Sequence, residues 1–364
     1  MGESMKTIRQ RKGTACFPAL LFLATILAGF AAWVVTGPHL APYDIPDPLA
    51  DPGALLRGRV TAAVDRSVEE EHPFREPALA LVTALRLAFF REGSGPVVVG
   101  RDYRLYTREE FEYHRDDEAT LARRLAWVQA AAEMFREDGV PLIIVLVPSK
   151  ARVASLENHW RRESALRFLG EEAFALVDPL PELIDREDSF LRTDTHWSWS
   201  GALATARLVA RTYKERYDTP LPGGARFVLE EPGTREHRGD LMRFLPLGRW
   251  ERLFPLKPDV ITLPGVREEA APGAGLFDVP AIPVALVGTS FSVGDAWNFA
   301  GALQYSLQAD VLALAEEGLG PFEPMQRYLT SETYREIEPS LVVWEIPERY
   351  LTLPETALPD LPQR

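Results

Sequence analysis

The pattern of apolar and polar positions predicts short buried strands separated by helices. Three continuous apolar runs, at 140–148, 282–288 and 340–346, end at residues that break regular structure, as strands covered on both faces do. Residues 118–138 and 201–217 repeat apolar positions every three or four residues, which is typical of helices packed on one side. Strands that alternate with helices in this way predict an α/β fold with a mainly parallel sheet.

The rest of the folded region shows weaker patterns. Helical periodicity runs through 54–91, with one apolar face predicted to hold Leu81, Leu85, Ala88 and Phe89. A β-branched run at 97–99, followed by glycine, predicts a strand and a turn. Residues 219–280 are rich in Pro and Gly and predict an insertion or subdomain. We therefore expect one main domain over 54–351 and a tail over 352–364.

The N-terminal region resembles an export signal. Residues 15–35 contain no charged side chain, which matches the ~20 apolar residues that span a bilayer. Basic residues precede this segment and acidic ones follow it, which predicts that 1–14 are cytoplasmic and the remainder lies outside. We interpret 15–35 as a transmembrane signal-anchor and the proline-rich 36–53 as a linker. A cleaved signal peptide is the alternative, although its apolar region would normally be shorter.

Charge and composition exclude several classes of protein. The 364 residues include 40 Lys and Arg against 53 Asp and Glu, a net charge of −13, which argues against a nucleic-acid partner. With 46% hydrophobic and 26% charged residues, the chain has the composition of a folded domain. Its single cysteine, Cys16, allows neither an intramolecular disulfide nor a Cys-based zinc site. We find no metal-binding motif and expect neither a metal nor a cofactor.

One candidate for nucleophilic chemistry follows the second apolar run. Ser290 comes two residues after Gly288, where a strand is predicted to end and a helix to begin. Ligands in parallel α/β sheets bind beyond the carboxyl ends of strands. Backbone N–H groups at such a turn can stabilise an oxyanion beside the serine hydroxyl. The alternative is that this serine only caps the helix.

A second candidate is the sequence Asp194-Thr-His196. In an extended segment, residues two apart point to the same side, so Asp194 could orient the His196 ring toward a nucleophile. The alternative is a capping aspartate and a packed histidine near a helix start. Among the other histidines only His237, with Asp240 nearby, is a rival, because it could line a loop near the site.

Taken together, the motifs resemble the alginate O-acetyltransferases of the AlgJ and AlgX type, periplasmic SGNH-hydrolase-like proteins that acetylate exopolysaccharides. The matching segments are 97–112, 143–153, 192–202, 287–292, 316–329 and 342–351. Asp-x-His precedes the serine here, whereas ordinary SGNH hydrolases have the serine first. The resemblance implies a circularly permuted, flavodoxin-like three-layer α/β/α sandwich. One departure is at Tyr103 and Arg104, which stand where the family tends to have Gly-Trp.

The resemblance also implies roles for individual residues. Ser290 would be the nucleophile, His196 the general base and Asp194 its orienting partner. The residues implied in oxyanion or substrate binding are Thr289, Gly318, Gly320, Trp197 and Arg349. Trp199 and Phe291 could add apolar faces for sugar rings, and Arg192, Arg235 and Arg238 could add positive charge, although core packing is the alternative for each aromatic residue.

The partners implied are a polysaccharide acceptor, alginate-like or cellulose-like, and a membrane-bound O-acyltransferase that supplies acetyl groups at the inner membrane. The absence of a carbohydrate-binding module after Tyr350 favours the AlgJ-like kind. Two alternative functions remain open at this point. One is a carbohydrate acetylesterase with the same triad, and the other is a non-catalytic polysaccharide-binding component of an export complex.

Overall fold

The computed structural model of the chain divides into two compact units. Met1–Phe90 and Pro246–Leu253 form the first unit, and Arg91–Leu245 and Phe254–Arg364 form the second. The domain predicted over 54–351 therefore has residues in both units.

Residues whose structure is described are 16–36, 53, 56–157, 160–169, 174–184, 186–217, 219–222, 224, 226–263, 265–269, 282–354 and 356–361. The predicted cytoplasmic segment 1–14 lies outside them, as does the predicted linker 36–53 apart from its two end residues. Most of the predicted tail, 352–364, is described.

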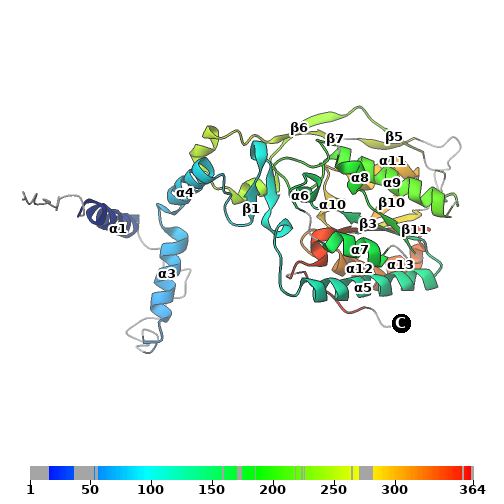
Figure 1. The fold of residues 1–364 in the computed structure, drawn as a ribbon, viewed down its shortest axis with the longest axis horizontal. Coiled ribbons are helices and arrows are strands. Elements are labelled where there is room, and N and C mark those ends of the chain that lie inside the picture. Colours follow the sequence, from blue (N-terminus) through cyan, green and yellow to red (C-terminus); the bar gives the residue numbers. More distant parts are fainter. Residues whose placement is uncertain are drawn as a thin grey trace, which may run out of the picture. The chain divides into compact units, whose positions relative to one another are not determined.

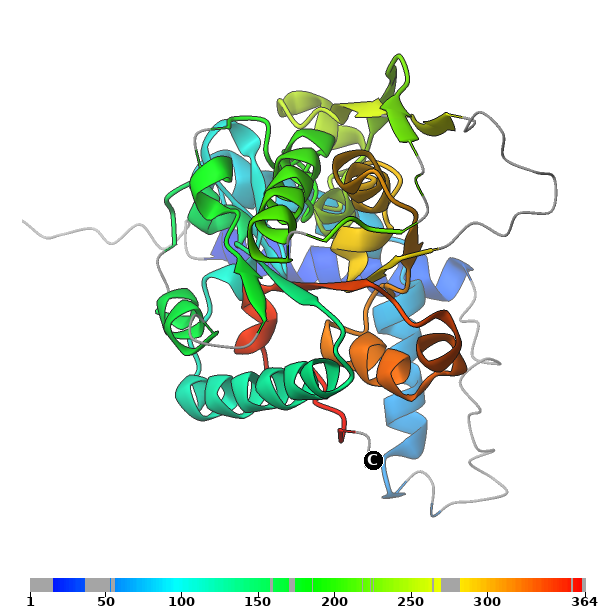
Figure 2. The ribbon, with the colours of Figure 1, turned by 90° about the vertical axis from the view of Figure 1, so that its right-hand side faces the viewer.

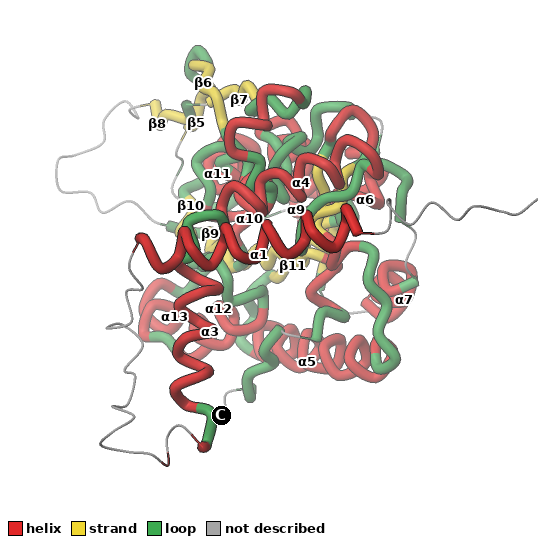
Figure 3. Tube along the Cα trace, turned by 90° about the vertical axis from the view of Figure 1, so that its left-hand side faces the viewer, coloured by secondary structure: helices red, strands yellow, loops and turns green. Residues whose placement is uncertain are grey.

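The first unit consists of helices over its described residues (Figure 3). They are α1 (Cys16–Thr36), α3 (Arg59–Glu71), α4 (Arg75–Phe90) and the 3₁₀ helix η5 (Gly248–Leu253). Over the described part of the chain, no helix combines the length and apolarity needed to cross a membrane. Residues 16–35 of the predicted anchor lie within the helix α1.

The helical pattern of 54–91 corresponds to two helices, and the residues that pack are not those of the apolar face in the pattern. The chain turns between α3 and α4, and the buried residues of α4 are Ala80, Thr83, Ala84 and Leu87. Leu81, Leu85 and Phe89, which the pattern places on one apolar face, are 43%, 46% and 76% exposed. Because α4 carries apolar residues on most of its surface, periodicity alone could not identify the face that is packed.

The second unit is built around a five-stranded sheet with the order β10-β9-β11-β3-β4. All four neighbouring pairs are parallel, as the sequence predicted. The strands are β3 (Leu142–Val147), β4 (Ala175–Val177), β9 (Val284–Val287), β10 (Val311–Ala313) and β11 (Leu341–Pro347). The three apolar runs correspond to β3, β9 and β11, the central strands, while the three-residue edge strands β4 and β10 were not predicted.

Helices cover both faces of this sheet, which makes the three-layer sandwich that the resemblance implied (Figure 2). Along β3, Ile143, Val145 and Val147 belong to the core beneath α9 (Trp199–Tyr217) and α11 (Phe299–Leu307). The alternate residues belong to the opposite core, against α5 (Asp117–Glu137), α7 (Arg161–Leu169) and α12 (Phe322–Thr330). Burial on both faces explains why these strands read as unbroken apolar runs.

Shorter elements complete the second unit. Two strands, β1 (Val97–Val99) and β2 (Leu105–Thr107), pair as an antiparallel hairpin. The short helices are η2 (Arg101–Tyr103), η3 (Arg108–Glu110), α6 (Lys150–Val153), α8 (Leu180–Leu183), α10 (Ser290–Val293), α13 (Glu332–Ile337) and η6 (Glu348–Leu351). Tyr103, at the departure from the family pattern, has φ 56°, a left-handed conformation that glycine adopts without strain.

The predicted insertion folds as two antiparallel ribbons alongside the sandwich (Figure 1). One ribbon pairs β5 (Arg226–Leu229) with β8 (Val266–Glu269), and the other pairs β6 (Gly233–His237) with β7 (Asp259–Leu263). The 3₁₀ helix η4 (Asp240–Phe244) follows β6 and contacts β2. The end of β6 and the start of η4 reach the residues described next.

Candidate active site

Ser290 lies just beyond the carboxyl end of β9, at the first position of α10. The turn before it is held by Glu345 of the neighbouring strand β11, whose carboxylate accepts hydrogen bonds from Thr289 N (2.8 Å), Thr289 Oγ1 and Ser292 Oγ (3.1 Å). A Cβ atom at Gly288 would lie 2.6 Å from this carboxylate, so only glycine fits there. The turn thus leaves Ser290 half-buried, with its N–H at a helix position that has no partner within the helix.

His196 links Ser290 to Asp194. Its Nε2 lies 2.7 Å from Ser290 Oγ, and its Nδ1 lies 2.6 Å from Asp194 Oδ1. With the proton on Nδ1, the ring donates to the carboxylate and presents a lone pair to the serine hydroxyl. This is the hydrogen-bond geometry of a nucleophile, a base and an orienting acid.

Aromatic side chains fix the plane of the His196 ring. Trp297 stacks on it at a centroid distance of 4.1 Å and an interplanar angle of 13°. Phe291 lies 4.8 Å away between ring centroids. These contacts leave His196 only 8% exposed, so the ring has little freedom to turn away from Ser290.

Four hydrogen bonds converge on the Asp194 carboxylate. Oδ1 accepts from His196 Nδ1 and from the His196 backbone N–H, and Oδ2 accepts from His237 Nε2 (2.8 Å) and the Asp240 backbone N–H (3.0 Å). Burial opposes ionisation, but the bonds from the two histidines outweigh it and hold the pKa of Asp194 well below its usual range. Asp194 is therefore a fixed negative charge beside His196.

Residues of the insertion hold the segment that carries Asp194 and His196 in place through hydrogen bonds. Asp240 accepts from the N–H (2.8 Å) and hydroxyl (2.9 Å) of Thr195, and Asp259 accepts from the N–H and hydroxyl of Thr193. A Cβ at Gly239 would come within 2.2 Å of the Thr193 backbone, so this close approach requires glycine. Acidic side chains on both sides of Asp194 thus determine the path of its backbone.

A buried lysine holds the same segment from the sandwich side. Lys150 Nζ donates to the backbone carbonyls of Leu105, Arg192 and Asp194, at 2.5, 3.0 and 2.8 Å. Burial lowers the pKa of Lys150 to about 7. The lysine begins α6, three residues after the end of β3, so it connects the end of a central strand to the Asp194 loop.

Ser290 opens into a cavity of about 610 Å³. The predicted residues Asp194, His196, Gly318 and Arg349 line it with Ser290. Arg243 from η4 also lines it, a contribution of the insertion that the sequence did not indicate. Arg349 is 7% exposed and lies over the Phe291 ring at 5.5 Å.

Three predicted binding residues are placed elsewhere. Trp197 is fully buried in the core against Phe291, so it is a core residue and presents no face to a sugar. Thr289 uses both its N–H and its hydroxyl to bind Glu345, which leaves neither for an oxyanion. Gly320 is not among the described residues that line the cavity. Phe291 is likewise buried, at 2% exposure.

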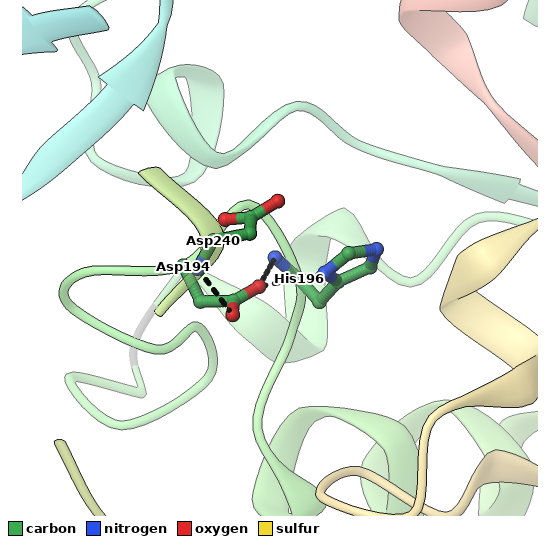
Figure 4. Close-up of side chains that lie close together, drawn as sticks. All are labelled: Asp194, His196 and Asp240. Atoms are coloured by element: carbon green, nitrogen blue, oxygen red, sulfur yellow. Dashed lines mark hydrogen bonds and ion pairs between the residues drawn. The ribbon is translucent and has the colours of Figure 1, made fainter. Parts of the chain in front are cut away.

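Asp194, His196 and Asp240 also form a compact group, with one potential ligand atom from each within 4.8 Å of the others (Figure 4). The carboxylate oxygens of both aspartates already accept hydrogen bonds from the protein, and the two ring nitrogens of His196 face Asp194 and Ser290. A metal ion would have to displace these bonds. The geometry therefore suits proton transfer better than metal binding.

The sequence pattern only weakly indicated some residues that support the site. Glu345 is the one charged residue in the otherwise apolar strand β11, and Lys150 lies three residues after the buried strand β3. A buried charge at the end of a central strand indicates a partner, but only the fold identifies which one. His237 was considered as a rival of His196, yet the structure places it on the other side of the same carboxylate.

Comparison with known proteins identifies the family. The family model described as SGNH hydrolase-like domain, acetyltransferase AlgX matches residues 97–348. The chain belongs to this family of SGNH hydrolase-like acetyltransferases. As a member it is an O-acyltransferase, as the sequence predicted.

Relatives within the family support this assignment over most of the chain. The probable alginate O-acetylase AlgJ of Pseudomonas fluorescens is 36% identical over 312 residues, covering 82% of this chain and 79% of that protein. The alginate biosynthesis protein AlgX of Azotobacter vinelandii is 27% identical over 271 residues, covering 68% of this chain and 53% of that protein. The family resemblance of the motifs is confirmed.

A solved structure agrees with the fold. The O-acetyltransferase domain of Pseudomonas putida AlgJ superposes with a TM-score of 0.64 at 34% identity, covering 72% of this chain and 94% of that domain. The structure of Pseudomonas aeruginosa AlgX, at 22% identity and a TM-score of 0.53, shares the fold. The predicted SGNH-like sandwich is thus confirmed by both comparisons.

Proposed function

We propose that this acetyltransferase works through an acetyl-serine intermediate on Ser290. The observation that carries the proposal is the unbroken hydrogen-bonded chain from Asp194 through His196 to Ser290. His196 takes the proton of Ser290 Oγ as the oxygen attacks the acetyl carbonyl carbon, and returns it to the departing group of the donor. The N–H of Ser290 stabilises the oxyanion, with Gly318 across the cavity as a second donor.

In the second half of the reaction, an acceptor hydroxyl attacks the acetyl-serine carbonyl. His196 removes the hydroxyl proton and then protonates Ser290 Oγ, which regenerates the free enzyme. We propose that the acceptor is an alginate-type polysaccharide, since the relatives named alginate O-acetylase cover most of this chain. Arg243, an exposed residue of the cavity wall, offers positive charge to uronate carboxylates despite the net charge of −13, whereas Arg349 is buried and lies 3.7 Å from Glu109.

The test is transfer of labelled acetyl from an activated ester to oligomannuronate. The wild-type protein should label the oligosaccharide and, when quenched early, carry one acetyl group on the peptide containing Ser290. Ser290→Ala should do neither. Release of free acetate at the same rate with or without oligosaccharide would refute transfer and indicate an esterase. Undiminished transfer by Ser290→Ala would refute the assigned nucleophile.

We further propose that the domain works in the periplasm and receives acetyl groups from a membrane-bound O-acyltransferase. The uncharged segment 15–35, preceded by basic residues, supports export. Acetyl-CoA is not readily available outside the cytoplasm, so another donor is required. Fusing alkaline phosphatase after residue 60 should give an enzyme active in whole cells, whereas an inactive fusion would refute export.

A further inference from the structure

The hydrogen bonds from His196 use only one oxygen of the Asp194 carboxylate, Oδ1. The other oxygen, Oδ2, accepts a hydrogen bond of 2.8 Å from Nε2 of His237. This histidine ends strand β6 in the insertion, and its side chain is 20% exposed. Asp194 therefore bridges two imidazole rings, one that faces Ser290 and one that does not.

We propose that His237 is a positioning residue that tunes His196 through Asp194, supporting catalysis when neutral and suppressing it when protonated. The inference rests on the proposed function of Ser290, His196 and Asp194. It gives the insertion a direct part in the reaction, beyond covering the sandwich.

The neutral form acts through orientation. With its proton on Nε2, His237 donates to Oδ2 and holds the plane of the Asp194 carboxylate so that Oδ1 points at His196 Nδ1. The Asp240 N–H donates to the same oxygen, so the backbone position of Asp194 does not depend on His237 alone. What His237 itself contributes is the orientation of the Asp194 carboxylate and a charge that depends on its own protonation.

The protonated form acts through charge. During proton transfer His196 becomes an imidazolium, and the negative charge of Asp194 stabilises it. A second positive charge on His237 would neutralise part of that carboxylate charge across a single hydrogen bond. It would also repel the developing charge on His196, so the transition state would be less stable.

The surroundings of His237 favour such a switch. Asp194 faces it from the segment before α9, Asp259 is its partner residue on β7, and Arg235 lies two residues before it on β6. The hydrogen bond to Asp194 raises the pKa of His237 above its ordinary value, against the opposing effects of burial and Arg235. The surroundings thus stabilise the charged form of His237 relative to a free histidine side chain.

Two substitutions separate orientation from charge. His237→Gln places an amide N–H near the position of Nε2 but cannot ionise, and His237→Leu removes the donor. The measurement is kcat/KM for acetyl transfer from 4-nitrophenyl acetate to oligomannuronate across about pH 5 to 9. His114→Gln, which removes an exposed histidine distant in sequence from His237, is the matched control.

For the wild type we expect the rate to fall on the acid side as His237 becomes protonated. His237→Gln should lose this part of the fall and retain more activity than wild type at low pH, while staying within about 3-fold of it at high pH. At high pH, where wild-type His237 is neutral, His237→Leu should be about 10- to 100-fold slower, the range for loss of a hydrogen bond to a charged group. His114→Gln should follow the wild type.

If kcat/KM fell at low pH in His237→Gln just as in the wild type, the charge effect would be refuted. If His237→Leu kept the full wild-type rate, the orienting effect would be refuted. If thermal melting shows that the Leu variant is unfolded, the Gln profile still decides. Transfer that persists in Ser290→Ala would instead refute the proposed function. A wild-type profile in His237→Gln beside an inactive Ser290→Ala would refute this inference alone.

Discussion

Replacing Glu345 tests how a buried carboxyl supports the nucleophile turn. Its side chain has no exposed surface, and burial raises its pKa from 4.5 to about 7 despite hydrogen bonds from Thr289 and Ser292. Glu345→Gln keeps an acceptor oxygen for Thr289 N and removes the ionisation. The substitution therefore separates the structural effect of this side chain from the cost of charging it.

The sign of the effect follows from proton linkage. Between its unfolded and folded pKa values, the folded protein binds the proton more tightly, so stability falls as pH rises. Each tenfold change in proton affinity is worth about 1.4 kcal/mol, so a rise from 4.5 to about 7 corresponds to roughly 3 kcal/mol. Wild type should lose this amount relative to Glu345→Gln between about pH 5 and pH 8.

Urea unfolding of both proteins, followed by tryptophan fluorescence at several pH values, measures this difference. Other titrating groups cancel in the comparison, and Glu118→Gln, which removes an exposed carboxyl from α5, controls for the loss of one charge. A stability difference between wild type and Glu345→Gln that stays constant with pH would refute the reasoning. Glu345→Gln should also keep its activity within a few-fold, because the turn keeps its acceptor.

Three further substitutions test the contact of the insertion with the Asp194 segment, the core and the triad. Gly239→Ala should lower kcat/KM by at least about 10-fold, because its Cβ would displace the Thr193 backbone that leads into Asp194. Trp197→Ala should lower the free energy of unfolding by about 3–5 kcal/mol, as loss of a fully buried aromatic does. Asp194→Asn should lower kcat by about 10⁴-fold, because an amide cannot hold the productive tautomer of the base.

Each of these three substitutions has a control variant or a result that would contradict the reasoning. Gly233→Ala, on the same ribbon with open space around the added methyl, should match wild type, and equal activity of the two Ala variants would argue against a role for the contact at Gly239. A raised KM with unchanged stability in Trp197→Ala would restore this residue as a sugar contact. Only a few-fold loss in Asp194→Asn would mean that the carboxylate is not needed to orient the base.

The local pattern of the sequence determined the central strands, the main helices and the two motifs of the site. Strands buried on both faces must be continuously apolar, so 140–148, 282–288 and 340–346 were recognisable without knowledge of their neighbours. The Asp-x-His spacing and the serine after a strand are likewise local features. The family resemblance implied that they meet, and the structure shows this as distances of 2.6 and 2.7 Å.

Tertiary structure alone decided what surrounds these residues. His237 reaches Asp194 from 43 residues away and Glu345 reaches Thr289 from 56, contacts that no local pattern encodes. Trp197 adjoins His196 in sequence yet lies in the core, because neighbours along an extended segment point to opposite sides. Local propensity determines which segments form helices and strands. The partners of a buried charge instead depend on which distant segments the packed sheet brings together.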